Sequence, residues 1–108
     1  GTLHELDRSA LVQILTVPRN AITRQYQRLF EFEDIELEVT VEALSAIATQ
    51  ALERGTGARG LRAILEEVML DIMYELPNLK NVRECIITED VVLNSEKPML
   101  VYQDASVA

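Results

Sequence analysis

The residues with the clearest chemical potential lie in one short segment, Gly55 to Arg62, which reads Gly-Thr-Gly-Ala-Arg-Gly-Leu-Arg. The apolar pattern that follows predicts that a helix begins here, which puts Arg59 in its first turn. A helix N-terminus has unpaired amides and about half a positive charge, so a cation there is unfavourable by roughly a few tenths of a kcal/mol. An anion reverses this balance, because free amides and a guanidinium fork both attract phosphate. Gly57 and Gly60 should allow another backbone or a ligand to approach closely.

The predicted helix should direct Arg59 away from the core of the domain. Its apolar residues recur at helical spacing until Pro77 stops the helix, and they are Leu61, Ile64, Leu65, Val68, Ile72 and Leu76. With about 100° of rotation per residue, Arg59 points almost directly away from this face and Arg62 lies at its flank. From physics alone, Arg59 could bind a phosphate or could be only a solvated surface residue, as an exposed arginine often is.

Composition limits the partners that the chain can bind. The chain has 108 residues, of which 48% are apolar, and these values fit one soluble globular domain. Its net charge of -8 argues against a nucleic-acid backbone or an anionic membrane as a general partner. Cys85 and His4 are too few soft ligands for a zinc site, so we expect no bound metal. Cys85 is expected to be a small buried residue of a strand, and the protein to belong to a reducing compartment.

Several catalytic patterns are absent from the sequence. It has no glycine-rich phosphate loop that ends in Lys and Ser or Thr, no paired carboxylates after a buried strand, and no Ser/His/Asp set. It also has no long apolar run of the kind that crosses a membrane. These absences argue against a catalyst that works alone.

The pattern along the chain predicts an α+β domain with about four helices and a small two- or three-stranded sheet at one edge. The first helix is expected to run from a cap at Asp7 to about Thr16, and the second to begin at a cap at Asn20 with Ile22, Tyr26, Leu29 and Phe30 on one face. The third is expected to have an apolar stripe of Leu44, Ile47, Ala48, Ala51 and Leu52 and to end at Gly55 in the left-handed conformation. The fourth is the long helix that ends at Pro77. The strands are expected at Ile35–Thr40, Glu84–Thr88 and Met99–Tyr102, with a helical turn near Glu89–Leu93.

The segments around Arg59 resemble a known family. They are Leu6-Asp7 with Leu11 to Leu15, Pro18 to Gln27, Gly57 to Arg62, and Asp71 to Pro77. As a set, they resemble the C-terminal small (lid) subdomain of the Clp/Hsp100 AAA+ ATPases. The ClpX type fits best, and HslU shares only part of the pattern. Residues 1–6 would be the hinge edge from a large AAA+ domain, residues 7–103 the small domain and residues 104–108 a tail.

The resemblance implies that Arg59 is the sensor 2 arginine, which contacts the terminal phosphates of a nucleotide held mainly by a P-loop domain outside this chain. Leu6, Ile14 and Ala58 would line the adenine side, although Ile14 is equally well read as a core residue. The cofactor would be ATP or ADP with Mg in a parent ATPase, with none bound tightly by these residues alone. Without the Walker motifs, these residues alone would be inactive.

The resemblance also implies partners and a location. The small domain would contact its own large domain and the neighbouring subunits of a homohexamer. Unfolded substrates and the ClpP peptidase would be reached through parts outside this chain, with no nucleic acid and no membrane. The location would be the bacterial cytoplasm, with the mitochondrial matrix or a plastid as alternatives.

A second hypothesis is a stand-alone acidic helical module that binds another protein and has no nucleotide role. Arg59 would then be only an interface residue, and Arg62 a surface or interdomain ion-pair partner. Tyr26 and Tyr74 have apolar neighbours and are expected in the core. The acidic residues from Glu31 to Glu38 are expected to solubilise a loop and a strand edge.

Overall fold

The computed structural model describes Ser9, Ala10, Val12 and residues 22–103. This part confirms the α+β fold, with four α-helices and a three-stranded sheet. The elements are α2 (Thr23–Glu31), β1 (Glu36–Val39), α3 (Val41–Arg54), α4 (Gly57–Glu75), the short 3-10 helix η1 (Leu76–Asn78), β2 (Val82–Ile87), α5 (Glu89–Asn94) and β3 (Met99–Tyr102). The predicted helix from Asp7 to Thr16 lies mostly outside the described residues.

The sheet has the strand order β1-β2-β3, with β1 parallel and β3 antiparallel to β2. Cys85 of β2 pairs with Leu37 on one side and with Leu100 on the other. Because β1 and β2 are parallel, the chain must cross over between them, and α3 and α4 form that crossover. The three predicted strands are confirmed, although β2 begins at Val82 rather than at Glu84.

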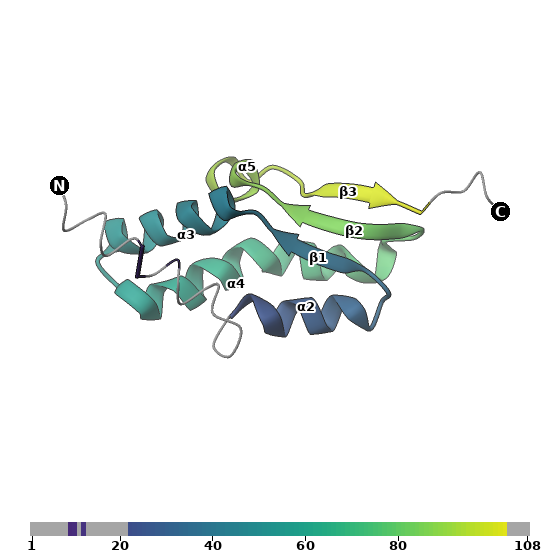
Figure 1. Cartoon of the computed structure of the whole chain (residues 1–108), viewed down its shortest axis with the longest axis horizontal. Helices are drawn as coiled ribbons and strands as arrows, with labels where there is room; N and C mark the ends of the chain where they lie inside the picture. The colour runs from purple at the N-terminus through teal and green to yellow at the C-terminus, as the bar shows by residue number, and fades with distance from the viewer. Residues whose placement is uncertain (1–8, 11, 13–21, 104–108) are drawn as a thin grey trace.

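The long helix α4 supplies much of the core and runs along the molecule in Figure 1. Its predicted stripe is confirmed, since Leu61, Ile64, Leu65, Ile72 and the following Leu76 are buried. Val68 is only partly buried, and Met69, which the pattern did not single out, is 1% exposed. The helix therefore presents a continuous apolar face to α3 and the sheet.

The core prediction for Tyr74 is wrong, because this side chain is 81% exposed. Tyr74 follows the buried Ile72 by about 200° of helical rotation, so it lies on the opposite side of α4. Tyr26, in contrast, is partly buried and packs against the core, as expected. Apolar neighbours in sequence did not distinguish the two tyrosines, whereas their phase on the helix does.

Helix α2 begins at Thr23, with Ile22 at its N-cap, and Asn20 lies outside the described residues. Ile22 and Phe30 are buried as predicted, but Leu29 is 43% exposed. Leu29 lies about 100° from Phe30 around the helix, which turns it out of the buried face. The partly buried Gln27 lies on that face and donates from Nε2 to the carbonyl of Leu37, 3.3 Å away. Part of the contact between α2 and β1 is therefore polar.

Helix α3 has both of its ends stabilised. Thr40 accepts a hydrogen bond from the amide of Ala43 at 3.1 Å, as an N-cap residue does. Gly55 ends the helix at a φ of 68°, which confirms the predicted left-handed C-cap. Helix α3 then packs along α4, and a bidentate ion pair between Arg54 and Glu67, with Nη2 and Oε2 at 3.1 Å, joins the two helices.

Cys85 is fully buried in β2, and burial raises the pKa of its thiol from 9.0 to about 11. The thiolate is the reactive form, so we expect a thiol reagent at pH 8 to modify Cys85 only after urea unfolds the chain. The folded state favours the protonated thiol. The stability that the folded state gains from this protonation is complete below pH 9 and is lost as the pH rises to about 11. Rapid modification of the folded chain at pH 8 would contradict this burial.

Candidate functional site

A tight turn joins α3 to α4 and positions the segment that contains Arg59. After Gly55, the amide of Thr56 donates to the carbonyl of Ala51 at 3.2 Å, and its hydroxyl donates to the same carbonyl at 3.5 Å. Both bonds tie the start of α4 to the last turn of α3. In Figure 1 this turn lies at the end of the molecule opposite the end of β3.

Helix α4 begins without a side-chain cap, although Thr56 occupies the N-cap position. The backbone of Thr56 has φ −104° and ψ −10°, whereas the capping Thr40 has the extended values of −67° and 158°. A capping side chain needs the extended geometry to reach the first-turn amides. The first turn of α4 also lacks an acidic residue, whereas α3 has Glu42 and α5 has Glu89 and Asp90 there. The N-terminus of α4 is therefore open to an anion.

This difference between the two threonines predicts different stability losses. Thr40→Ala removes a cap and should lower the free energy of unfolding by about 1 kcal/mol. Thr56→Ala removes a long hydrogen bond to Ala51 but no cap, and should cost less than about half of that. Urea unfolding followed by circular dichroism measures both variants, and equal losses would show that Thr56 caps α4 after all.

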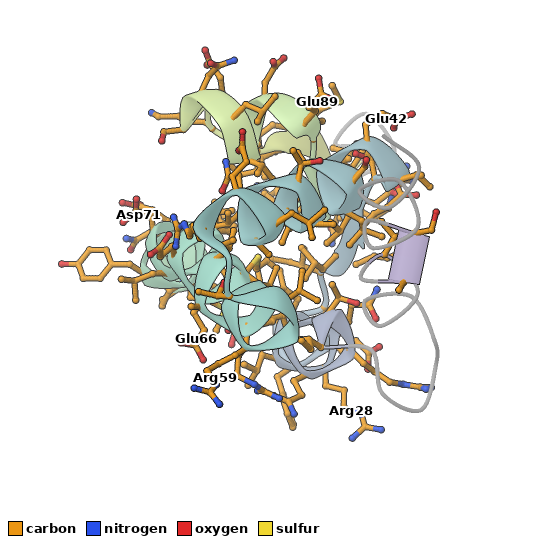
Figure 2. The ribbon with its side chains drawn as sticks, turned by 90° about the vertical axis from the view of Figure 1, so that its left-hand side faces the viewer. Arg28, Glu42, Arg59, Glu66, Asp71 and Glu89 are labelled. Carbon is orange, nitrogen blue, oxygen red and sulfur yellow. The ribbon has the colours of Figure 1, made fainter. Side chains whose placement is uncertain are left out.

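Arg59 is exposed in the first turn of α4, as the sequence predicted. Among the residues that the structure describes, it has no hydrogen bond or ion pair. Figure 2 shows its side chain projecting away from α3. A guanidinium without a partner in the described part, beside uncapped amides, can bind an anion that comes from outside these elements.

Further charged side chains lie on the same side of the molecule as Arg59. Figure 2 shows Arg28 of α2 on the same side of the molecule as Arg59, opposite Glu42 and Glu89, with Glu66 also on the Arg59 side. Arg62 is exposed, and its charge lies close enough to Tyr26 to influence that phenol. Burial is the main cause that raises the pKa of Tyr26, Glu66 raises it further, and Arg62 lowers it. This side of a chain with an acidic net charge thus has arginines from two helices, α2 and α4.

The two glycines beside Arg59 differ in their structural roles. Gly57 has a φ of 57° with open space around it, so its backbone conformation requires glycine. Gly60 is buried, and the space next to it is occupied by Thr56 of the same chain. Gly60 was expected to admit another backbone or a ligand, whereas in this structure a side chain of the domain itself fills that space.

Two predicted site residues, the adenine-side Leu6 and Ile14, lie outside the described part, as does His4, to which the sequence assigned no role. Ala58 belongs to α4, directly before Arg59. Within the described ranges, no group of three or more His, Cys, Asp or Glu side chains could hold a metal ion. The same ranges contain no helix with the length and apolar character needed to cross a membrane.

A protein-family model for the C-terminal D2-small domain of ClpB protein matches residues 6–88. The chain belongs to this family. The ClpB D2-small family comprises C-terminal AAA+ small subdomains of Clp/Hsp100 chaperones, which confirms the resemblance at that level. The match includes the α3–α4 turn with Arg59 and ends before α5 and β3.

Two features of this ClpB D2-small domain could not be predicted from local sequence pattern. The direction of the Thr56 hydroxyl follows from the observed ψ and from its hydrogen bond to Ala51 of α3. Arg28 lies far from Arg59 in sequence, and only the packing of the helices brings it to the same side. An arginine on the exposed face of α2 was the only available signal.

Proposed function

We propose that this domain is the sensor 2 small subdomain of an ATP-dependent protein unfoldase of the ClpX type. The observation that carries the proposal is Arg59, exposed and unpaired among the described residues, in the uncapped first turn of α4. Membership in the Clp/Hsp100 small-subdomain family supports a role in an AAA+ chaperone. Mg would be held with the nucleotide by a separate P-loop domain.

Arg59 would contact the terminal phosphates of ATP across the boundary between the two domains. Its planar guanidinium offers several donors at fixed angles, so it can bind two phosphate oxygens at once, which lysine cannot do with the same geometry. The open amides of α4 add favourable potential at the same place. When the terminal phosphate leaves after hydrolysis, Arg59 loses a contact, which favours a different angle between the domains.

Rotation about a hinge in residues 1–6 would then drive unfolding of a protein substrate. The proposed assembly is a homohexamer that transfers this motion between subunits and delivers substrate to the ClpP peptidase. This chain would contribute Arg59 and a rigid body, while the parts outside it would bind substrate and peptidase. The cytoplasm of a bacterium is the proposed location.

The exposed side of α4 fits a contact with a neighbouring subunit. Leu70 and Tyr74 are 69% and 81% exposed and lie about one turn apart on α4, so they form an exposed apolar patch. Tyr74 also lines a groove of about 690 Å³, together with Val68, Ile72 and Leu100 among others. Covering this surface would remove it from water and hold the domains of a ring together.

Calorimetry tests whether this domain is half of a nucleotide site. We expect little or no heat of binding when a non-hydrolysable ATP analogue is titrated into the 108-residue chain, because one arginine and a few amides cannot replace a P-loop. The same titration into a protein that joins this domain to its P-loop domain should show binding. Tight binding by the 108 residues alone would contradict the proposed half-site. If the natural protein has no P-loop domain, the stand-alone interaction module is favoured.

A further inference from the structure

The start of α4 contains a close contact within the domain that involves the residue directly after Arg59. Gly60 is buried in α4, and a Cβ atom built there would overlap Oγ1 of Thr56 and lie 2.8 Å from Cβ of Thr56. The same Cβ would lie 3.8 Å from Cβ of Ala51 in α3. The side chain of Thr56 therefore occupies the space that any larger residue at position 60 would need.

Thr56 also contacts α3 through its two hydrogen bonds to the carbonyl of Ala51. Thr56 thus bonds to the end of α3 through its amide and hydroxyl, and its Oγ1 and Cβ also pack against Gly60 in the first turn of α4. An element that is packed against a neighbour keeps its orientation better than one that is not. The contact therefore helps to hold the start of α4 against the end of α3.

We propose that Thr56, packed over Gly60, is the positioning residue for Arg59. The proposal rests on the proposed function of Arg59. Because Arg59 directly precedes Gly60, a shift or rotation of this turn moves the guanidinium with it. A displacement of about 1 Å at a reacting group can reduce a rate by about a hundredfold, so a small change here is measurable. The contact also keeps the Thr56 hydroxyl bonded to Ala51 and away from the first-turn amides.

Gly60→Ala tests the contact in a protein that joins this domain to its P-loop domain. A glycine-to-alanine change inside a helix ordinarily stabilises it. Here we expect the urea midpoint of the 108-residue chain to fall, because the new methyl group displaces Thr56. We expect kcat for ATP hydrolysis to fall by about tenfold and KM to stay within about twofold, because the P-loop domain supplies most of the nucleotide binding.

The double variant Thr56→Ala/Gly60→Ala separates positioning from general damage. It removes the overlapping Oγ1 but keeps the Cβ of residue 56 at 2.8 Å, so we expect a partial recovery, with kcat between that of Gly60→Ala and that of Thr56→Ala alone. If Gly60→Ala does not fold, Thr56→Ala alone should still lower kcat by about two- to threefold without a change in KM. An unchanged kcat in folded Gly60→Ala, or in Thr56→Ala if Gly60→Ala does not fold, would overturn the positioning role.

Arg59→Ala is measured in parallel and separates the two proposals. If Arg59→Ala lowers kcat and the Gly60 and Thr56 variants do not, the positioning role fails and the proposed function stands. If Arg59→Ala leaves kcat unchanged, the proposed function itself fails, and the positioning role fails with it. A loss of activity in Gly60→Ala that only follows the unfolded fraction, with no recovery in the double variant, also overturns the positioning role.

Discussion

Arg59→Ala is expected to reduce ATP-driven protein unfolding by roughly a hundredfold in a protein that joins this domain to its P-loop domain, because loss of one preorganised donor commonly costs about 10²- to 10³-fold in kcat. The structure gives Arg59 no hydrogen bond or ion pair among the described residues, so its removal should break none of those that hold this part together. Arg59→Lys keeps the charge but loses the planar fork, and it should retain only part of the activity. The measurement is steady-state ATP hydrolysis together with unfolding of a fluorescent substrate.

The stability of the same variant should change in the opposite direction. A cation in the first turn of a helix is unfavourable by roughly a few tenths of a kcal/mol, so Arg59→Ala should leave the 108-residue chain as stable as before or slightly more stable. Arg83→Ala, which changes an exposed arginine of β2, is the matched control and should have near-normal activity. Near-normal unfolding by Arg59→Ala would refute the sensor 2 role, whatever the stability.

Phe30→Ala is expected to have the largest effect on stability, with a loss of about 3–5 kcal/mol in the free energy of unfolding. Phe30 is fully buried at the end of α2, where this helix packs against β1 and the core. Removing the ring leaves a cavity that rigid neighbours fill only in part. Urea unfolding followed by circular dichroism gives the value, provided that the transition is two-state.

Phe32→Ala provides a matched control two positions along the chain. Phe32 is 82% exposed, so its truncation should change the free energy of unfolding by less than about 0.5 kcal/mol. The chemical change is the same in both variants, and only the burial differs. Similar losses for the two variants would contradict the packing of α2 in this fold.

The helices and strands of this fold were predictable where the spacing of apolar residues agreed with the positions of the glycine and proline residues that end an element. The alternation from Ile35 to Thr40 identified β1, Gly55 marked the end of α3, and the apolar stripe to Pro77 identified α4. These signals are local, because a strand or a helix buries one face at a fixed period. The exposure of Arg59 followed from the same helical spacing, because the position of the buried apolar face determines where each remaining residue lies around the helix.

The remaining features depend on information that local pattern does not contain. Tyr74 was placed in the core because of its apolar neighbours, although its phase on α4 directs it outward. The uncapped start of α4 depends on the ψ angle of Thr56 and on the bond of its hydroxyl to Ala51, neither of which a local pattern shows. The family match confirms a Clp/Hsp100 small subdomain, while the ClpX type still rests on the motifs around Arg59.

The most direct measurement of the central proposal is a structure of the domain joined to its P-loop domain, with a non-hydrolysable ATP analogue bound. We expect the guanidinium of Arg59 within about 3 Å of the terminal phosphate oxygens, the distance of a charge-assisted hydrogen bond. The amides of the first turn of α4 should face the same phosphates. If Arg59 faces solvent while the nucleotide is bound, the guanidinium does not sense the phosphates, and the proposed sensor 2 function is wrong.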